Sequence, residues 1–84
     1  MASRFIVYGR TGCPFCRMAL DTLDDLRQEK AFFDFTDDPE SIEDAKRFYK
    51  WATVPMILEN NTETGETRFL GGYDDLRRRF RHEL

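Results

Sequence analysis

Two cysteines separated by two residues stand between an apolar segment and a helical pattern, and they are the only cysteines of the chain. The apolar segment, residues 4–8, has the composition of a buried strand and ends at Gly9. Pro14 suits the first turn of a helix, because a residue there needs no backbone N–H. The pattern therefore predicts Cys13 at a helix N-terminus, where the helix dipole and free N–H groups lower the pKa of a thiol. Cys16 would lie one turn further along the helix, within reach of a disulfide with Cys13.

The first half of the chain predicts a strand–helix–strand unit. Beyond Cys13, apolar residues spaced by three and four mark one face of a helix. This face carries Cys16, Ala19, Leu20, Leu23 and Leu26. We expect the helix to end near Glu29–Lys30 and a second strand to span residues 31–35. Two strands joined by one helix in this way are parallel and connected by a right-handed crossover.

The second half predicts a further helix followed by a pair of strands. Asp38, Pro39 and Glu40 combine an N-cap residue, a proline for the first turn and a carboxylate near the positive end of the dipole. The apolar face of this helix would carry Ile42, Ala45, Phe48, Tyr49 and Ala52. Short strands at residues 56–58 and 67–70 then flank a polar hairpin loop.

A last helix is predicted to open at Asp74 and Asp75, with Leu76 and Phe80 on its inner side. The predicted order of elements is β-α-β-α-β-β-α. We therefore expect an α/β protein, with a four-stranded mixed β-sheet flanked by three helices, in a single domain over residues 1–84. The helices would cover both faces of the sheet.

Length, net charge and composition exclude several classes of protein. A chain of 84 residues can bury one core of modest size. Its net charge of −3 argues against a nucleic-acid-binding protein, which is normally basic. The N-terminal apolar run, residues 5–8, is far too short for a signal peptide or a membrane span, so we expect a cytoplasmic protein without membrane contact. In a reducing cytosol, a lone CxxC pair is redox-active or metal-binding more often than structural.

A metal site is the alternative to a redox-active pair. A zinc site normally has four ligands, and the one histidine that could join the two cysteines, His82, is distant in the sequence. We therefore expect a catalytic dithiol and no metal. The arginines between Arg77 and Arg81 favour a charged helix end that complements the dipole over the alternative, a docking patch for an acidic partner.

Three segments together resemble signatures of the glutaredoxin family. Residues 9–16 (GRTGCPFC) resemble its CPYC active site, with Phe15 in place of the usual Tyr. Residues 53–55 (TVP) resemble a signature whose proline is cis, and residues 71–76 (GGYDDL) resemble its glutathione-binding loop. The similarity covers essentially the whole chain and implies a dithiol glutaredoxin with the thioredoxin-like fold.

The resemblance implies a role for each matching position. Cys13 and Cys16 would be the catalytic residues. The residues implied in glutathione binding are Arg10, Phe15, Thr53, Val54, Pro55, Gly72, Tyr73, Asp74 and Asp75. The backbone of Val54 would pair with an extended cysteinyl peptide, of which glutathione is one. Asp75 would meet the α-ammonium group of glutathione.

Charged and polar groups of glutathione would be held by the other implied positions. The helix start at Tyr73 and Asp74 would bind the γ-glutamyl carboxylate through backbone N–H groups. Arg10 would stabilise the Cys13 thiolate and attract the glycine carboxylate. Many relatives have a polar residue directly before the TVP segment, and this chain has Ala52 there. Arg47 and Lys50 are the candidates for supplying the cation that this position lacks.

The resemblance further implies a glutathione-dependent thiol–disulfide oxidoreductase that reduces protein disulfides and glutathione mixed disulfides. Cys13 would attack, Cys16 would resolve the mixed disulfide, and glutathione would be a co-substrate, with no tightly bound cofactor. Expected partners are glutathione and disulfide-containing or glutathionylated proteins, with ribonucleotide reductase as one candidate, and we expect a monomer. Two alternatives stay open: an electron donor reduced by thioredoxin reductase, and an iron–sulfur cluster carrier.

Overall fold

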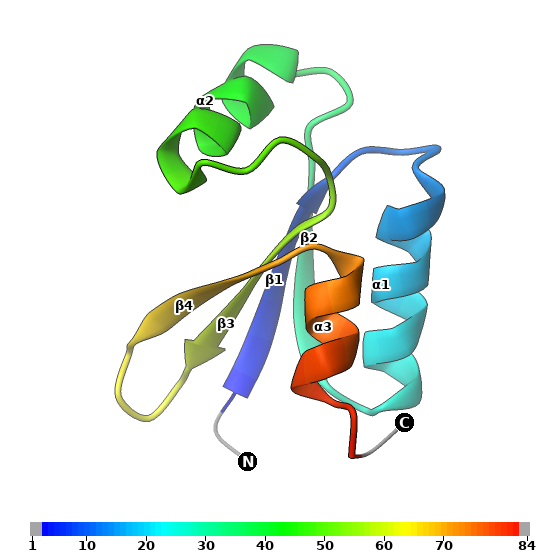
Figure 1. Ribbon diagram of the computed structural model, residues 1–84, viewed down its shortest axis with the longest axis vertical. Coiled ribbons are helices and arrows are strands. Elements are labelled where there is room, and N and C mark those ends of the chain that lie inside the picture. The colour runs from blue at the N-terminus through cyan, green and yellow to red at the C-terminus, as the bar shows by residue number, and fades with distance from the viewer. Residues whose placement is uncertain (1–2, 83–84) are drawn as a thin grey trace.

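The computed structural model describes residues 3–82, which form one mixed sheet and the helices that flank it (Figure 1). The elements are β1 (Ser3–Gly9), α1 (Pro14–Asp25), β2 (Glu29–Asp34), α2 (Pro39–Tyr49), β3 (Met56–Asn61), β4 (Thr67–Gly71) and α3 (Tyr73–Arg79). The strand order is β2-β1-β3-β4, in which β1 and β2 are parallel and the other neighbours antiparallel. The four-stranded mixed sheet and the element order predicted from the sequence are confirmed.

One face of the sheet forms the apolar core under α1 and α3. Side chains of a strand alternate between the two faces, and on β1 it is Phe5 and Val7 that are fully buried on this side. They pack in one cluster with Ala19, Leu23, Ile57, Leu76 and Phe80. The rings of Phe5 and Phe80 are 5.4 Å apart. The predicted inner side of the last helix, Leu76 and Phe80, is therefore correct.

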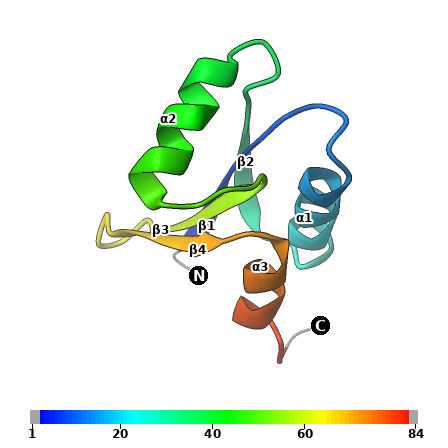
Figure 2. The ribbon, with the colours of Figure 1, turned by 45° about the horizontal axis from the view of Figure 1, so that its top comes forward.

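The other face of the sheet carries α2, which lies apart from the other two helices (Figures 1 and 2). α2 contains no buried residue, and Phe48 is 78% exposed. Its contact with the sheet is made by Tyr49, whose ring stacks on that of Phe69 in β4 at 4.7 Å. The predicted apolar face is therefore wrong at Phe48. It is also wrong at Ala52, which is exposed beyond the helix end that left-handed Lys50 sets (φ 54°).

The first helix ends earlier than its apolar spacing predicts. α1 stops at Asp25, and Arg27 adopts a left-handed conformation (φ 56°) that turns the chain back toward the sheet. Glu29 and Lys30 then belong to β2, because they pair with the start of β1. The expected end near Glu29–Lys30 is wrong because the pairing of two distant strands, which spacing along one helix does not encode, takes these residues into the sheet.

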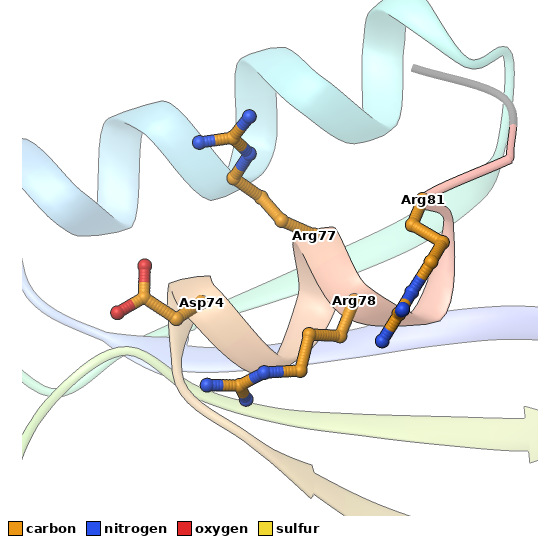
Figure 3. Close-up of a pocket in the computed structure, with 4 residues that line it drawn as sticks. All are labelled: Asp74, Arg77, Arg78 and Arg81. Atoms are coloured by element: carbon orange, nitrogen blue, oxygen red, sulfur yellow. The ribbon is translucent and has the colours of Figure 1, made fainter.

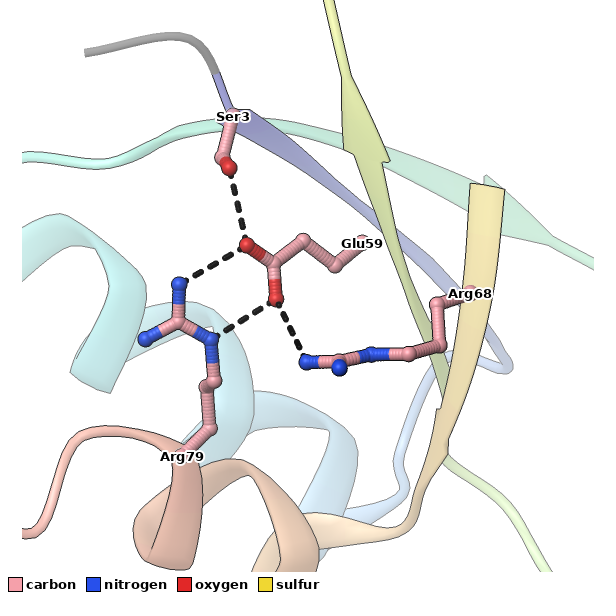
Figure 4. Close-up of polar contacts among 4 residues, drawn as sticks. All are labelled: Ser3, Glu59, Arg68 and Arg79. Carbon is pink, nitrogen blue, oxygen red and sulfur yellow. Dashed lines mark hydrogen bonds and ion pairs between the residues drawn. The ribbon is translucent and has the colours of Figure 1, made fainter. Parts of the chain in front are cut away.

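The end of the sheet where β1 begins is tied to α3 by a cluster of polar side chains (Figure 4). Glu59 on β3 is 9% exposed, and its carboxylate accepts hydrogen bonds from Nε and Nη2 of Arg79, each at 2.8 Å. Ser3 donates a further bond at 2.8 Å, and Arg68 of β4 lies 3.6 Å away. The side chains of four separate elements therefore fix the C-terminal end of α3 against the sheet.

No helix among residues 3–82 has the length and apolar character that crossing a membrane requires.

Candidate active site

Cys13 caps the N-terminus of α1, as the sequence predicts. Its Sγ accepts a hydrogen bond from the backbone N–H of Cys16 at 3.4 Å, and both cysteines are in the reduced form. Burial alone would raise the pKa of the Cys13 thiol. Hydrogen bonds from the thiol and backbone of Cys16, together with the positive charge of Arg10, lower the pKa below its ordinary value instead. Cys13 is thus the cysteine that ionises first.

Cys16 is held as a thiol. It is 2% exposed and packs against the end of β1, where a Cβ on Gly9 would lie only 2.5 Å from the sulfur. Burial, and the thiol's hydrogen bond to Cys13, raise the pKa of Cys16 to about 12. Gly9 is therefore required for this close approach. The two sulfurs of the pair therefore differ: the pKa of Cys13 is lowered, and that of Cys16 is raised.

The loop that carries Arg10 toward Cys13 is tethered to the end of β2. The Thr11 hydroxyl donates to Oδ2 of Asp34 at 2.8 Å, and the backbone N–H of Thr11 donates to Oγ1 of Thr36, also at 2.8 Å. Hydrogen bonds from Thr36 and then Thr11 lower the pKa of the Asp34 carboxyl. All of these groups lie at the surface. The loop is held by exposed hydrogen bonds and by no apolar packing of its own.

A hollow of about 300 Å3 lies between the start of α1, the segment before β3 and the start of α3. Its lining residues are Phe15, Trp51, Thr53, Val54, Pro55, Gly72, Tyr73, Asp74 and Asp75. Eight of these nine were predicted from the resemblance, and the structure brings them together from three distant segments. The Val54–Pro55 bond is cis, as the resemblance implies. Arg10, Cys13 and Cys16 are outside this lining.

Trp51 is the lining residue that the sequence did not indicate. Its indole Nε1 is buried and has no hydrogen-bond partner among residues 3–82. The ring packs edge-on against Phe69 with centroids 5.5 Å apart and lies beside Gly72. The signal available in the sequence was the chain's single tryptophan two positions before the TVP segment. The apolar spacing extends the predicted helix to Ala52 and so places Trp51 in a helix, whereas α2 ends at Tyr49.

Asp75 fixes the start of α3. Its Oδ2 accepts a hydrogen bond from the backbone N–H of Gly72 at 2.9 Å, and its Oδ1 accepts one from Arg78 at 2.6 Å. Gly71 has φ 124° and approaches the Asp75 carboxylate so closely that a Cβ there would collide with it. Any ammonium group that binds Asp75 must therefore share the carboxylate with Arg78 or displace it.

The two cations suggested in place of Ala52 are not in the hollow. Arg47 forms an exposed ion pair with Asp44 and lines a separate depression along α2. Lys50 is exposed at the C-terminal end of α2. Within residues 3–82 there is no group of three or more histidine, cysteine and acidic side chains arranged to hold a metal ion.

Comparisons with known proteins give the family and the fold of this chain. The family model of glutaredoxin matches residues 5–62. Wheat glutaredoxin has a TM-score of 0.71 at 16% identity, over 94% of this chain and 72% of its own. A buckwheat glutaredoxin–glutathione complex has a TM-score of 0.70 at 22% identity, over 95% and 70%. Glutaredoxin 1 from Francisella tularensis, complexed with cacodylate, has a TM-score of 0.67 at 19% identity, over 96% and 95%. A sequence search of curated proteins finds no match.

Proposed function

Because this chain belongs to the glutaredoxin family, we propose that it reduces protein disulfides and glutathione mixed disulfides with electrons from glutathione. The family and the fold support a thiol–disulfide oxidoreductase. The single observation that carries the proposal is the inequality of the two cysteines: the pKa of Cys13 is lowered and that of Cys16 is raised to about 12. This inequality supports attack by Cys13 and resolution by Cys16.

The proposed reaction begins with the Cys13 thiolate. Its sulfur attacks one sulfur of the substrate disulfide, a new S–S bond forms, and the other substrate sulfur leaves as a thiolate that takes up a proton. With a protein disulfide, Cys16 then loses its proton and attacks Cys13, which releases the reduced substrate. The substrate gains two electrons, and the enzyme is left with a Cys13–Cys16 disulfide that two glutathione molecules reduce.

With a glutathione mixed disulfide, only Cys13 is required. Cys13 takes the glutathionyl group, the substrate thiol leaves, and a second glutathione releases the first as glutathione disulfide. The reduction potentials of glutaredoxins, about −200 to −230 mV, lie close to the potential of the cellular glutathione pool, about −220 to −260 mV. Glutathione can therefore drive this cycle. In the proposal glutathione is a co-substrate and not a resident cofactor.

The hollow beside Cys13 is the proposed site for glutathione. It is lined by Thr53, Val54 and Pro55, and the backbone of Val54 can pair with an extended peptide as a neighbouring strand would. On the other side lie the start of α3 and the carboxylate of Asp75, which suit a carboxylate and an ammonium group respectively. A relative with this fold is known in complex with glutathione, which supports the assignment.

The test is a coupled assay with glutathione, glutathione reductase, NADPH and a small glutathione mixed disulfide, run on the wild type and on Cys16→Ser. We expect turnover in both, because Cys13 acts alone on this substrate. A disulfide-bonded protein substrate should be reduced by the wild type and much more slowly by Cys16→Ser. Turnover in neither protein, with disulfide reduction restored by thioredoxin reductase, would show that glutathione is not the electron donor.

A further inference from the structure

A second hollow, of about 380 Å3, runs along the outer side of α3 (Figure 3). Its lining residues are Asp74, Arg77, Arg78 and Arg81. All four are exposed. The glutathione-binding role proposed above uses only the first of them, so the three arginines are left without a function by that proposal.

Two of these arginines have no polar side-chain partner in the part of the chain that the structure describes. No side-chain hydrogen bond or ion pair within residues 3–82 involves Arg77 or Arg81, whereas Arg78 binds Asp75 and Arg79 binds Glu59. In Figure 3 the Arg77 side chain extends away from α3, and the Arg81 side chain runs beside the last turn of that helix. A net charge of −3 leaves enough carboxylates to pair every cation of the chain, and here the fold does not do so. Arg78 is paired with Asp75, and the two remaining arginines face one carboxylate, Asp74, so the hollow keeps a net positive charge.

This hollow adjoins the proposed glutathione site, because Asp74 lines both. In the glutathione site the rings of Phe15 and Tyr73 are 6.2 Å apart, and Asp74 follows Tyr73 in the chain. Arg77 lies three residues, or about 5 Å, beyond Asp74 along α3. Each residue of an extended peptide spans about 3.3 Å, so we take roughly three to six residues as the reach from a cysteine that reacts at Cys13 to the arginines.

We propose that this hollow docks an acidic segment of the proteins whose disulfides Cys13 reduces, with carboxylates about three to six residues from the reacting cysteine. The proposal rests on the disulfide reduction proposed above and names the substrate class for it. Arginine side chains carry planar forks of N–H donors that fit carboxylates in pairs. This molecule already uses that geometry, since Arg79 binds both oxygens of Glu59.

The charge distribution favours an acidic protein segment over a nucleic acid. A polyanion that extends beyond the hollow would meet a chain with 16 acidic and 13 basic side chains. A short acidic segment needs only the arginines of α3. Because they are exposed, their attraction should act mainly on encounter with the substrate and should be screened by salt.

The experiment compares two disulfide-containing peptides that differ only in charge. One has Asp and Glu roughly three to six residues from its reacting cysteine, and the other has Asn and Gln at those positions. Reduction is measured with glutathione, glutathione reductase and NADPH in the wild type and in Arg77→Gln/Arg81→Gln. A matched control, Arg4→Gln/Lys46→Gln, removes the same charge from outside the hollow, on β1 and α2. Binding of each peptide to Cys13→Ser, with and without the Arg77 and Arg81 substitutions, is measured separately by fluorescence anisotropy.

We expect the wild type and the control to prefer the acidic peptide in kcat/KM and in affinity by about tenfold at an ionic strength of about 0.01 M. The preference should fall to about twofold in Arg77→Gln/Arg81→Gln, and in the wild type as the ionic strength approaches 1 M. Equal preference in the variant and the wild type, or no preference in the wild type, overturns docking. If the wild type did not turn over a small glutathione mixed disulfide, the proposed function would be wrong. The anisotropy measurements would then still show whether the acidic peptide binds at the arginines.

Discussion

The two ends of the sheet each hold a carboxylate, and they hold it differently. Glu59, near the start of β1, is 9% exposed and bound by Arg79, Ser3 and Arg68. Asp34, at the end of β2 beside the active-site loop, is exposed and bound by Thr11 and Thr36. Glu59 connects elements far apart in the chain, whereas Asp34 holds one loop.

The difference separates what holds the fold together from what performs the proposed chemistry. At the Glu59 end, the buried carboxylate has its partners inside the molecule. At the active-site end, the groups that would meet a substrate are exposed, as is the side chain of Arg77, or have no hydrogen-bond partner among residues 3–82, as is the case for the indole Nε1 of Trp51. Substitutions at the two ends should therefore change stability and activity independently.

The largest effect should come from Cys13→Ser. A hydroxyl has a far higher pKa than a thiol and does not form a disulfide, so turnover of every disulfide substrate should fall to the uncatalysed rate. The free energy of unfolding should change by less than about 1 kcal/mol, because the oxygen can cap α1 as the sulfur does. The coupled assay and a urea titration measure the two quantities. Residual turnover above the uncatalysed rate would mean that Cys13 is not the nucleophile.

Glu59→Ala should show the opposite pattern. It removes the acceptor of three hydrogen-bond donors and takes from Arg79 the carboxylate that it binds, which should cost about 2–4 kcal/mol of stability. The kcat/KM per folded molecule for a small glutathione mixed disulfide should stay within about twofold of the wild type, since Glu59 lies away from Cys13. Urea titration and the coupled assay measure the two effects.

A matched control for Glu59 is Glu43→Ala on α2. The Glu43 side chain is 57% exposed and pairs with Lys46 at 3.1 Å, so its loss should cost less than about 0.5 kcal/mol. Equal costs at the two sites would contradict the structural role of Glu59.

The hydrogen bonds from Arg79 outweigh burial and lower the pKa of Glu59 below 4.5. Its contribution to stability is therefore complete above pH 4.5 and is lost as the pH falls through the lowered pKa.

The contrast between the two ends also explains what the sequence predicted. The residues of the active-site end lie in short contiguous segments, such as residues 9–16 and 53–55, so their patterns could be read directly. Glu59, Ser3 and Arg79 come from separate parts of the chain, and only strand pairing and the packing of α3 bring them together. No spacing within one element encodes such a cluster.

The errors at helix ends have the same origin. Apolar spacing predicted α1 as far as Glu29–Lys30, whereas pairing with β1 takes both residues into β2. Phe48 follows the spacing of an inward face but is 78% exposed, because α2 contacts the sheet through Tyr49 at its end. Periodicity predicts that a face is apolar. It does not predict how much of that face another element covers.

A smaller effect is expected from Arg10→Gln. The charge of Arg10 helps to lower the pKa of Cys13, so the substitution should raise that pKa and slow the reaction near neutral pH about fivefold or less. The rate of alkylation by iodoacetamide, measured against pH in a Cys16→Ser background, should rise to its plateau at higher pH than with Arg10 present. The control Arg17→Gln, an exposed cation paired with Asp21, should leave the profile unchanged. A profile unmoved by Arg10→Gln would leave the hydrogen bonds as the sole cause of the lowered pKa.

The smallest effect should follow from Asp34→Ala, the counterpart of Glu59→Ala at the opposite end of the sheet. Asp34 tethers the loop that carries Arg10, but its hydrogen bonds are exposed and water can replace them. We expect kcat/KM for a small glutathione mixed disulfide to fall less than about twofold, with little change in the urea midpoint. If Asp34→Ala shifted the urea midpoint as far as Glu59→Ala does, the loop would be part of the structural framework and the contrast between the two ends would fail. Thr36→Ala, which removes another of the loop's bonds and keeps the carboxylate charge, would separate tethering from any electrostatic effect of Asp34 on Cys13.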